Sequence, residues 1–135
     1  MVIAHALLGF TEFHKESVAV LRSADQTWAP DLLRAELLST LWQWTRAREM
    51  PIDITLDLLQ DGEGLIRSYV PVQDLWGDAL RLSMARNHSP YDTLFVALAA
   101  RLGVKVVTYD GPLMKKFPEW TISVPDFLAG DRPTQ

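Results

Sequence analysis

The stretch SPYDTLFVALAARLGVKVVTYDG, from Ser89 to Gly111, most strongly limits what this chain can fold into. Its dense apolar residues over Pro90–Leu102 predict a helix that packs into a core. Gly103 then supplies the left-handed residue with which many helices end. The five residues Val104–Thr108 are mostly β-branched and predict a short buried strand. A helix followed at once by a strand indicates an α/β protein.

Helices alternate with short apolar strands along the rest of the chain. Further helices are expected at residues 12–23, 31–48, 52–59 and 74–86, with short helices or turns at 111–117 and 125–129. Strands or extended segments are expected at residues 1–8, 27–30, 65–72 and 121–124, and a turn at 61–64. This alternation predicts a three-layer α/β/α sandwich around a short, mostly parallel sheet. The length of 135 residues suits a single domain, residues 1–135, with one core.

Composition excludes several classes of protein. The chain has no cysteine, so disulfides, thiolate nucleophiles and zinc–cysteine sites are excluded. Its net charge is −4 without a long basic run, which argues against a broad grip on duplex DNA. No apolar run reaches the ~20 residues that a membrane-spanning helix needs. The first ten residues, MVIAHALLGF, lack the basic start of a signal peptide, so we expect a cytoplasmic protein.

Three carboxylates fall where the predicted elements would bring them inward or to strand ends: Glu36, Asp92 and Asp110. Glu36 lies within the apolar arc of its helix, which carries it toward the core. A buried carboxylate is costly unless it is paired or bound to a metal. The structural alternative is an edge position, or a pair with an arginine such as Arg34 or Arg81.

The two aspartates also have structural explanations. Ser89-Pro90-Tyr91-Asp92 fits a capping box with Ser89 as N-cap, although Glu or Gln is the usual third residue. Asp110 precedes Gly-Pro and would suit a turn or the cap of the short helix that follows. Each aspartate alone therefore favours local structure over function.

Taken together, the three carboxylates indicate more. Sites in parallel α/β sheets form at the carboxyl ends of the strands, and Asp110 follows the end of a predicted strand. Clustered carboxylates repel one another, and a hard divalent cation relieves that repulsion. Mg²⁺ and Mn²⁺ prefer oxygen ligands and retain several waters. Such a metal activates water and neutralises the charge that develops on a phosphodiester. The pattern therefore points to phosphodiester hydrolysis.

Two segments resemble PIN-domain proteins. SPYDTLFVALAARLGVKVVTYDGPLMKKF resembles the family's C-terminal signature, in which a Ser/Thr–x–Tyr–Asp run opens a helix and a strand then ends near a second aspartate. PDLLRAELLSTLW resembles the family's central helix, in which a proline is followed by an inward glutamate. The resemblance covers nearly the whole chain and is greatest to the toxin components of VapBC toxin–antitoxin pairs.

This resemblance implies an acidic site that binds Mg²⁺ or Mn²⁺ and cuts RNA. Glu36, Asp92 and Asp110 match three of the family's acidic positions, and Thr108 matches the small hydroxyl residue near the last acid. The resemblance also implies a homodimer and inhibition by a small antitoxin protein, with no role at a membrane.

One family acid is missing from this chain. The family's first strand ends in an aspartate, but an ungapped match to MVIAHALLGF places Ala4 there, and a one-residue gap supplies no acid either. The resemblance then predicts weak metal binding and low or absent activity. An alternative is a catalytically degenerate binding module that acts through dimerisation or antitoxin binding. A response-regulator-like domain is a third reading, but it needs an acid pair after the first strand.

Aromatic and basic residues suggest possible contacts with partners. Trp42 and Trp44 lie on different sides of the predicted central helix, which favours one in the core and the other in a partner interface. The alternative is a partly exposed aromatic packed under a loop. Five cations could contact phosphates or simply be solvated helix ends: Arg46, Arg48, Arg86, Lys115 and Lys116.

Overall fold

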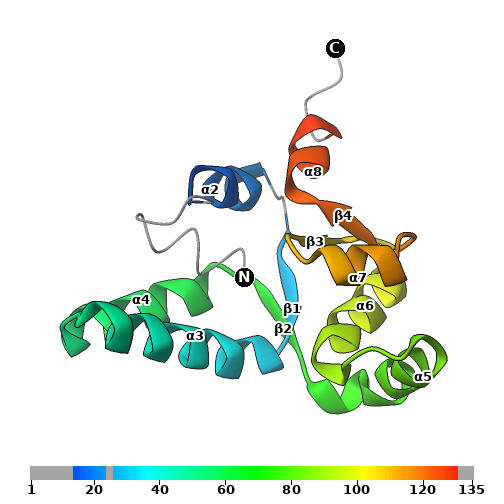
Figure 1. The fold of residues 1–135 in the computed structure, drawn as a ribbon, viewed down its shortest axis with the longest axis horizontal. Helices are drawn as coiled ribbons and strands as arrows, with labels where there is room; N and C mark the ends of the chain where they lie inside the picture. Colours follow the sequence, from blue (N-terminus) through cyan, green and yellow to red (C-terminus); the bar gives the residue numbers. More distant parts are fainter. Residues whose placement is uncertain (1–13, 24–25, 131–135) are drawn as a thin grey trace. The chain divides into compact units, whose positions relative to one another are not determined.

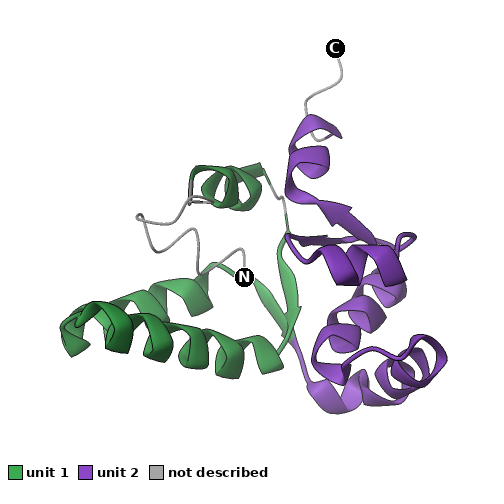
Figure 2. Ribbon diagram, viewed as in Figure 1, with its two compact units in different colours: residues 1–69 green, residues 70–135 purple. Residues whose placement is uncertain are grey.

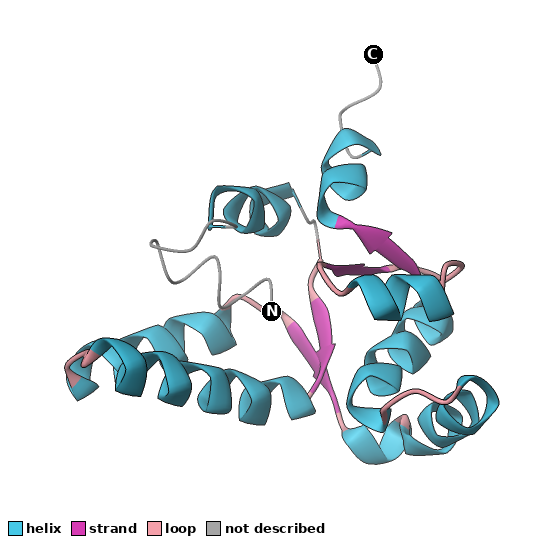
Figure 3. Ribbon diagram, viewed as in Figure 1, coloured by secondary structure: helices cyan, strands magenta, loops and turns pink. Residues whose placement is uncertain are grey.

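A computed structural model describes residues 14–23 and 26–130 of the chain (Figure 1). The chain divides into two compact units, Met1–Tyr69 and Val70–Gln135 (Figure 2). Within the described residues, two two-stranded sheets accompany the helices (Figure 3). The α/β class predicted from the sequence is confirmed, whereas the single domain stays a prediction. The strand expected at residues 1–8 lies outside the described residues.

The first unit contains three described helices and a short sheet. Its elements are α2 (His14–Ser23), β1 (Trp28–Pro30), α3 (Leu32–Arg48), α4 (Ile52–Gly64) and β2 (Ser68–Val70), of which β1 pairs with β2. Helix α3 buries Leu33, Leu37 and Leu41, which recur at the spacing of one helix face. Glu49 then adopts the left-handed conformation, with φ 50°, and ends the helix.

Helix α4 is longer than the sequence predicts. We expected it to end near residue 59 and to be followed by a turn, but it continues to Gly64. Gly62 is buried, and the carbonyl of Glu63 accepts a 2.7 Å hydrogen bond from the hydroxyl of Tyr69. The carboxylate of Glu63 contacts Arg34 of α3 at 3.1 Å. These contacts outweigh the preference of Asp-Gly and Glu-Gly for turns, so the predicted turn is wrong.

Arg34 and Glu63 also act on the ionisation of Tyr69. The Arg34 guanidinium lies 3.8 Å from the centre of the Tyr69 ring. Burial raises the pKa of the Tyr69 phenol, the negative charge of Glu63 raises it further, and the positive charge of Arg34 opposes both. The phenol therefore stays a hydrogen-bond donor to the end of α4 at neutral pH.

The second unit contains the stretch on which the fold class was predicted. Its elements are the 3₁₀ helix η1 (Val72–Asp74), α5 (Trp76–Arg86), α6 (Pro90–Leu102), β3 (Val106–Thr108), α7 (Gly111–Lys116), β4 (Thr121–Ser123) and α8 (Val124–Gly130). Strands β3 and β4 pair in parallel, with Val106 opposite Thr121 and Thr108 opposite Ser123. This pairing confirms that the predicted β–α–β segment forms a parallel sheet.

The core of the second unit lies between α6 and α7. Val96, Leu113 and Phe117 are buried together, and Leu82 and Trp120 pack against them. Gly103 ends α6 with φ 69°, as its position predicts. The following strand is shorter and less buried than expected: β3 covers only three half-buried residues, and Val104 is exposed. The strand is short because Val104 N is bonded to Ala99 O and so completes the end of α6 instead of entering the sheet.

Candidate active site

Asp92 stands in the first turn of α6. Ser89 caps this helix, because its side-chain oxygen accepts a hydrogen bond from the Tyr91 amide at 3.3 Å, and Pro90 occupies the first helical position. The N-cap predicted at Ser89 is therefore confirmed, whereas the Asp92 carboxylate contacts His88. A carboxylate in the first turn is favoured by the positive end of the helix dipole. The Asp92 side chain is 40% exposed, so a cation or substrate can reach it.

A histidine that the sequence analysis left unassigned holds Asp92. His88 Nε2 lies 2.7 Å from Asp92 Oδ2, and the His88 side chain is only 11% exposed. The His88 and Phe117 rings pack edge to face, with their centres 5.9 Å apart and their planes at 88° to each other. Periodicity could not find this pair, because His88 precedes the N-cap and is outside the helix. The signal available in the sequence was a histidine four residues before an acid across a predicted cap.

Asp110 joins β3 to α7 and is fixed at both its backbone and its side chain. Its amide donates to Thr108 Oγ1 at 2.9 Å, and its Oδ1 accepts from the Leu113 amide at 3.1 Å. Asp110 is thus the N-cap of α7, as one of the two sequence interpretations predicted. Thr108, which matches the family's hydroxyl position, sets the backbone from which the carboxylate projects.

Glu36 belongs to the first unit, whereas both aspartates belong to the second. It lies on α3 between the buried Leu33 and Leu37, is half-buried, and keeps its Oε1 atom away from solvent. The inward position predicted for this glutamate is therefore observed. The two arginines considered as alternative partners contact other carboxylates: Arg34 contacts Glu63 at 3.1 Å, and Arg81 contacts Asp78 at 3.2 Å.

The chemistry of these acids fits a hard divalent cation. All three offer carboxylate oxygens, the ligands that Mg²⁺ and Mn²⁺ prefer. Asp92 uses Oδ2 and Asp110 uses Oδ1 in the hydrogen bonds described above, and a carboxylate has lone pairs to spare on both oxygens. Within residues 14–23 and 26–130, no group of three or more His, Asp or Glu side chains is close enough to hold a metal ion. Ala4 lies outside those ranges.

The basic residues proposed as phosphate contacts are mostly engaged with the protein itself. Arg46 lies 4.8 Å above the ring of Trp42, and Arg48 lies 5.0 Å above that of Trp44. Trp42 is exposed and Trp44 is half-buried, so neither tryptophan is fully in the core as one of them was predicted to be. The predicted role of the other in a partner interface stays a prediction.

The end of α5 and the end of α7 are tied together by charged side chains. Arg86 contacts Glu119 Oε1 at 2.5 Å and donates to the Lys116 carbonyl at 2.7 Å, while Lys116 donates to the Asn87 carbonyl. Hydrogen bonds from its own backbone amide and from Arg86 lower the pKa of the Glu119 carboxyl. These contacts fix the segment that carries His88.

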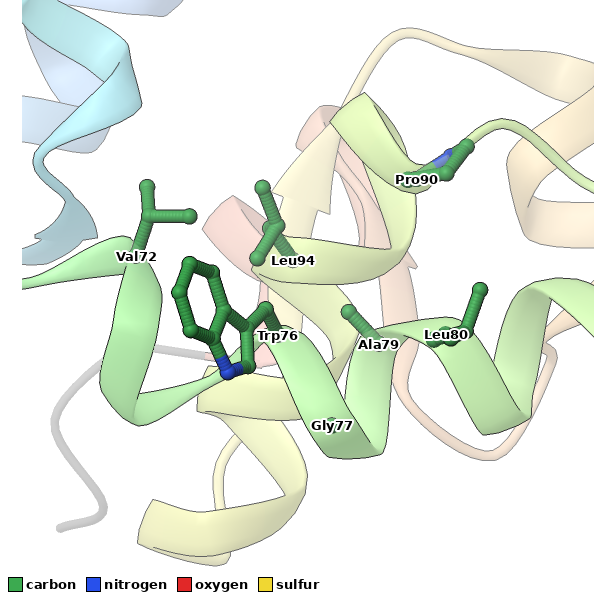
Figure 4. Close-up of a pocket in the computed structure, with 7 residues that line it drawn as sticks. All are labelled: Val72, Trp76, Gly77, Ala79, Leu80, Pro90 and Leu94. Atoms are coloured by element: carbon green, nitrogen blue, oxygen red, sulfur yellow. The ribbon is translucent and has the colours of Figure 1, made fainter.

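An apolar pocket of about 590 Å³ lies beside α5 and the start of α6 (Figure 4). Seven residues line it: Val72, Trp76, Gly77, Ala79, Leu80, Pro90 and Leu94. The lining offers no charged side chain, so it suits an apolar group and not a phosphate or a metal.

Among the described residues, no helix is long and apolar enough to cross a membrane.

An α/β fold with carboxylates on the central helix, at a helix start and at a strand end has the features of a PIN-like protein. No family model matches the chain. A comparison with curated proteins finds 28% identity over 112 residues to Ribonuclease VapC3 of Pyrobaculum aerophilum, an alignment that covers 79% of this chain and 83% of that protein. At the family level, this similarity supports a VapC-like PIN protein.

Proposed function

We propose that this chain is the toxin of a toxin–antitoxin pair and descends from metal-dependent endoribonucleases that hydrolyse the phosphodiesters of RNA. The observation that carries this proposal is the similarity to Ribonuclease VapC3 over most of both chains. Residues 1–135 would then act as one PIN-like domain in the cytoplasm, as a homodimer held in check by a small antitoxin protein.

The three acids share one role in this proposal. Asp92, Asp110 and Glu36 would hold Mg²⁺ or Mn²⁺, which supplies an activated water and neutralises developing phosphate charge. Asp92 and Asp110 are supported by helix starts that fix their backbones, which keeps their carboxylates in place without reorganisation. Glu36 is supported by its half-buried place on α3. Because Ala4 stands where the family has its first acid, we expect weak metal binding and low or absent cleavage.

The decisive experiment restores the missing acid. Purified chain, Ala4→Asp, and Ala4→Asp/Asp92→Asn are incubated with a mixed RNA pool in Mn²⁺ or Mg²⁺, with EDTA controls. Ala4→Asp should cleave RNA at least ten times faster than the natural chain, and the added Asp92→Asn should remove that gain. Val104→Gln changes an exposed residue that is not one of the proposed metal ligands. It serves as the control for effects of substitution as such on the cleavage rate. If Ala4→Asp gains nothing and Asp92→Asn changes nothing, the catalytic proposal fails.

A second candidate function is favoured by Ala4: a PIN-fold binding module without activity. Its support is the missing acid together with exposed apolar side chains such as Trp76, Leu80 and Met84 on α5. Such a chain would bind its antitoxin as tightly as an active relative and bind no metal. Light scattering of the purified chain, alone and with the product of a neighbouring short gene, would report dimerisation and complex formation. A monomer that ignores that product would count against this function.

A further inference from the structure

A row of apolar side chains on α5 is exposed to solvent. Trp76, Leu80 and Met84 are 63%, 58% and 80% exposed. They recur every four residues, which places them along one side of the helix. Another side of α5 packs on α6, where Ala79 and Ser83 are buried. An exposed apolar row on an element that is already packed into a core is typical of a surface that binds a partner.

The apolar pocket of Figure 4 lies beside this row. Trp76 and Leu80 line it from α5, and Pro90 and Leu94 line it from α6. Its volume of about 590 Å³ is ample for a large apolar side chain. Met84 lies one helical turn beyond Leu80, outside the lining, and methionine is a flexible side chain that adapts to irregular hollows. The row therefore has a hollow at its Trp76 end and a protruding side chain at its Met84 end.

Two opposite charges accompany the row. Asp78 and Arg81 contact each other at 3.2 Å, and both side chains are exposed. Leu80 is the midpoint of the row, so the acid precedes the midpoint by two residues and the base follows it by one. When two identical helices pack antiparallel about this midpoint, residues before it on one helix lie level with residues after it on the other. The acid of each helix then comes level with the base of the other.

We propose that α5 forms the interface of a homodimer, in which a second copy of this chain packs antiparallel on it about a two-fold axis at Leu80. Met84 of each copy is then level with Trp76 and the hollow of the other copy. Rows of side chains four residues apart pack into one another when the two helices cross at about 50°. This inference rests on the homodimer of the proposed function and gives that homodimer a surface.

The self-complementarity of the surface favours a second copy over an unrelated partner. An unrelated apolar helix would use the hollow alone, whereas a second copy also supplies Met84 to fill it and charges to match Asp78 and Arg81. The charges also decide the direction of packing. A parallel pair in register sets acid against acid and base against base, and like charges that meet at an interface disfavour it. The antiparallel arrangement sets each charge against its opposite.

The experiment measures the dimer dissociation constant of the full chain by sedimentation equilibrium, in about 0.15 M NaCl to limit long-range repulsion. Asp78→Arg and Arg81→Asp are measured separately and as an equal mixture. Met84→Lys and Met84→Gln test the apolar row, and Val104→Gln is the matched control because it changes an exposed apolar residue outside α5. Circular dichroism reports whether each variant is folded, which we expect because all four side chains are exposed.

We expect Asp78→Arg and Arg81→Asp each to raise the Kd about 5-fold or more, because each dimer contains two such pairs and like charges replace opposite ones. The equal mixture should return to within about 3-fold of the natural chain, since two arginines of one variant meet two aspartates of the other. An ion pair within one helix cannot be restored by mixing. Met84→Lys should raise the Kd about 10-fold or more, because it loses the burial of an apolar side chain, and Met84→Gln should act in the same direction.

The failures of the interface and of the homodimer are distinguishable. A natural chain that remains monomeric at every concentration overturns both. If the natural chain dimerises and the α5 variants dimerise equally well, this interface is overturned and the homodimer of the proposed function stands. If the two charge variants are weakened alone and mixing restores nothing, the antiparallel pairing is overturned, because the loss then belongs to the pair within one helix. Equal losses in Val104→Gln and the Met84 variants also overturn it, because the effect then belongs to no particular surface.

Discussion

At the scale of single residues, the candidate acids have structural roles as well as proposed functional ones. Asp110 caps α7 through Leu113, and Asp92 contacts His88 at the start of α6. Capping and metal binding are compatible, because a carboxylate has two oxygens and four lone-pair sites. A substitution that removes such an aspartate therefore changes folding and function together, unless the replacement preserves one of them.

Asp110 offers a way to separate the two roles. Asp110→Asn keeps an oxygen that can accept from the Leu113 amide, so the free energy of unfolding should change by less than about 0.5 kcal/mol. Asp110→Ala removes the acceptor and should cost about 1 kcal/mol. Urea unfolding of both variants measures the difference. Equal stability of the two variants would show that the cap contributes nothing in solution.

At the scale of elements, each unit joins two helices through a pair of hydroxyls. Thr45 and Thr55 are 2.7 Å apart between α3 and α4, and Ser83 and Thr93 are 2.7 Å apart between α5 and α6. The second pair is fully buried, and Thr93 also donates to the Ala79 carbonyl at 3.0 Å. A buried polar pair stabilises helix packing only while both members are satisfied.

Thr93→Val should therefore lower the free energy of unfolding by about 1–3 kcal/mol, because it leaves Ser83 and the Ala79 carbonyl without their partner in the core. Adding Ser83→Ala should return part of this loss. Thr55→Val in the first unit is the comparison, and it should cost less because its pair is only partly buried. Urea unfolding checks all three, and a Thr93→Val chain as stable as the natural one would contradict the argument.

The sequence predicted elements best where local chemistry and tertiary packing agree. Ser89, Gly103 and Asp110 marked helix ends that the structure confirms, because caps depend on neighbours within a few residues. The end of α4 was predicted wrongly, since contacts of Glu63 with residues on other elements decide it. His88 was missed because it precedes the cap of α6, so helical periodicity does not connect it with Asp92.

At the scale of the whole molecule, the three candidate acids are divided between the two units. Glu36 is provided by the first unit, and Asp92 and Asp110 by the second. A metal bound by the aspartates of the second unit would stabilise that unit, because a ligand that binds only the folded arrangement stabilises it. The composition of 17 acidic and 13 basic residues gives a net charge of −4, so a bound divalent cation would also reduce the repulsion among carboxylates.

Mn²⁺ should therefore raise the melting temperature of Ala4→Asp more than that of the natural chain. Each tenfold gain in affinity adds about 1.4 kcal/mol of stability at saturating metal. Scanning fluorimetry with Mn²⁺ or with EDTA measures the shift, and NaCl of equal ionic strength controls for screening of surface charge. Equal shifts in the two chains would contradict a role for an acid at position 4 in metal binding.

The cap formed by Asp110 also bears on how a protein of this kind loses its activity. Selection for a stable fold alone is enough to retain an aspartate whose side chain begins α7, even in a lineage that no longer cuts RNA. Mutational drift would then first remove the acids that have no structural role in the fold. If Ala4 stands in place of an acid, as the proposed function expects, a chain that has lost this acid and kept Asp110 is what such an order of loss would leave behind. For this reason, a capping aspartate that is retained in a relative indicates only that the fold is retained. Retained activity is indicated by the acids that have no structural partner.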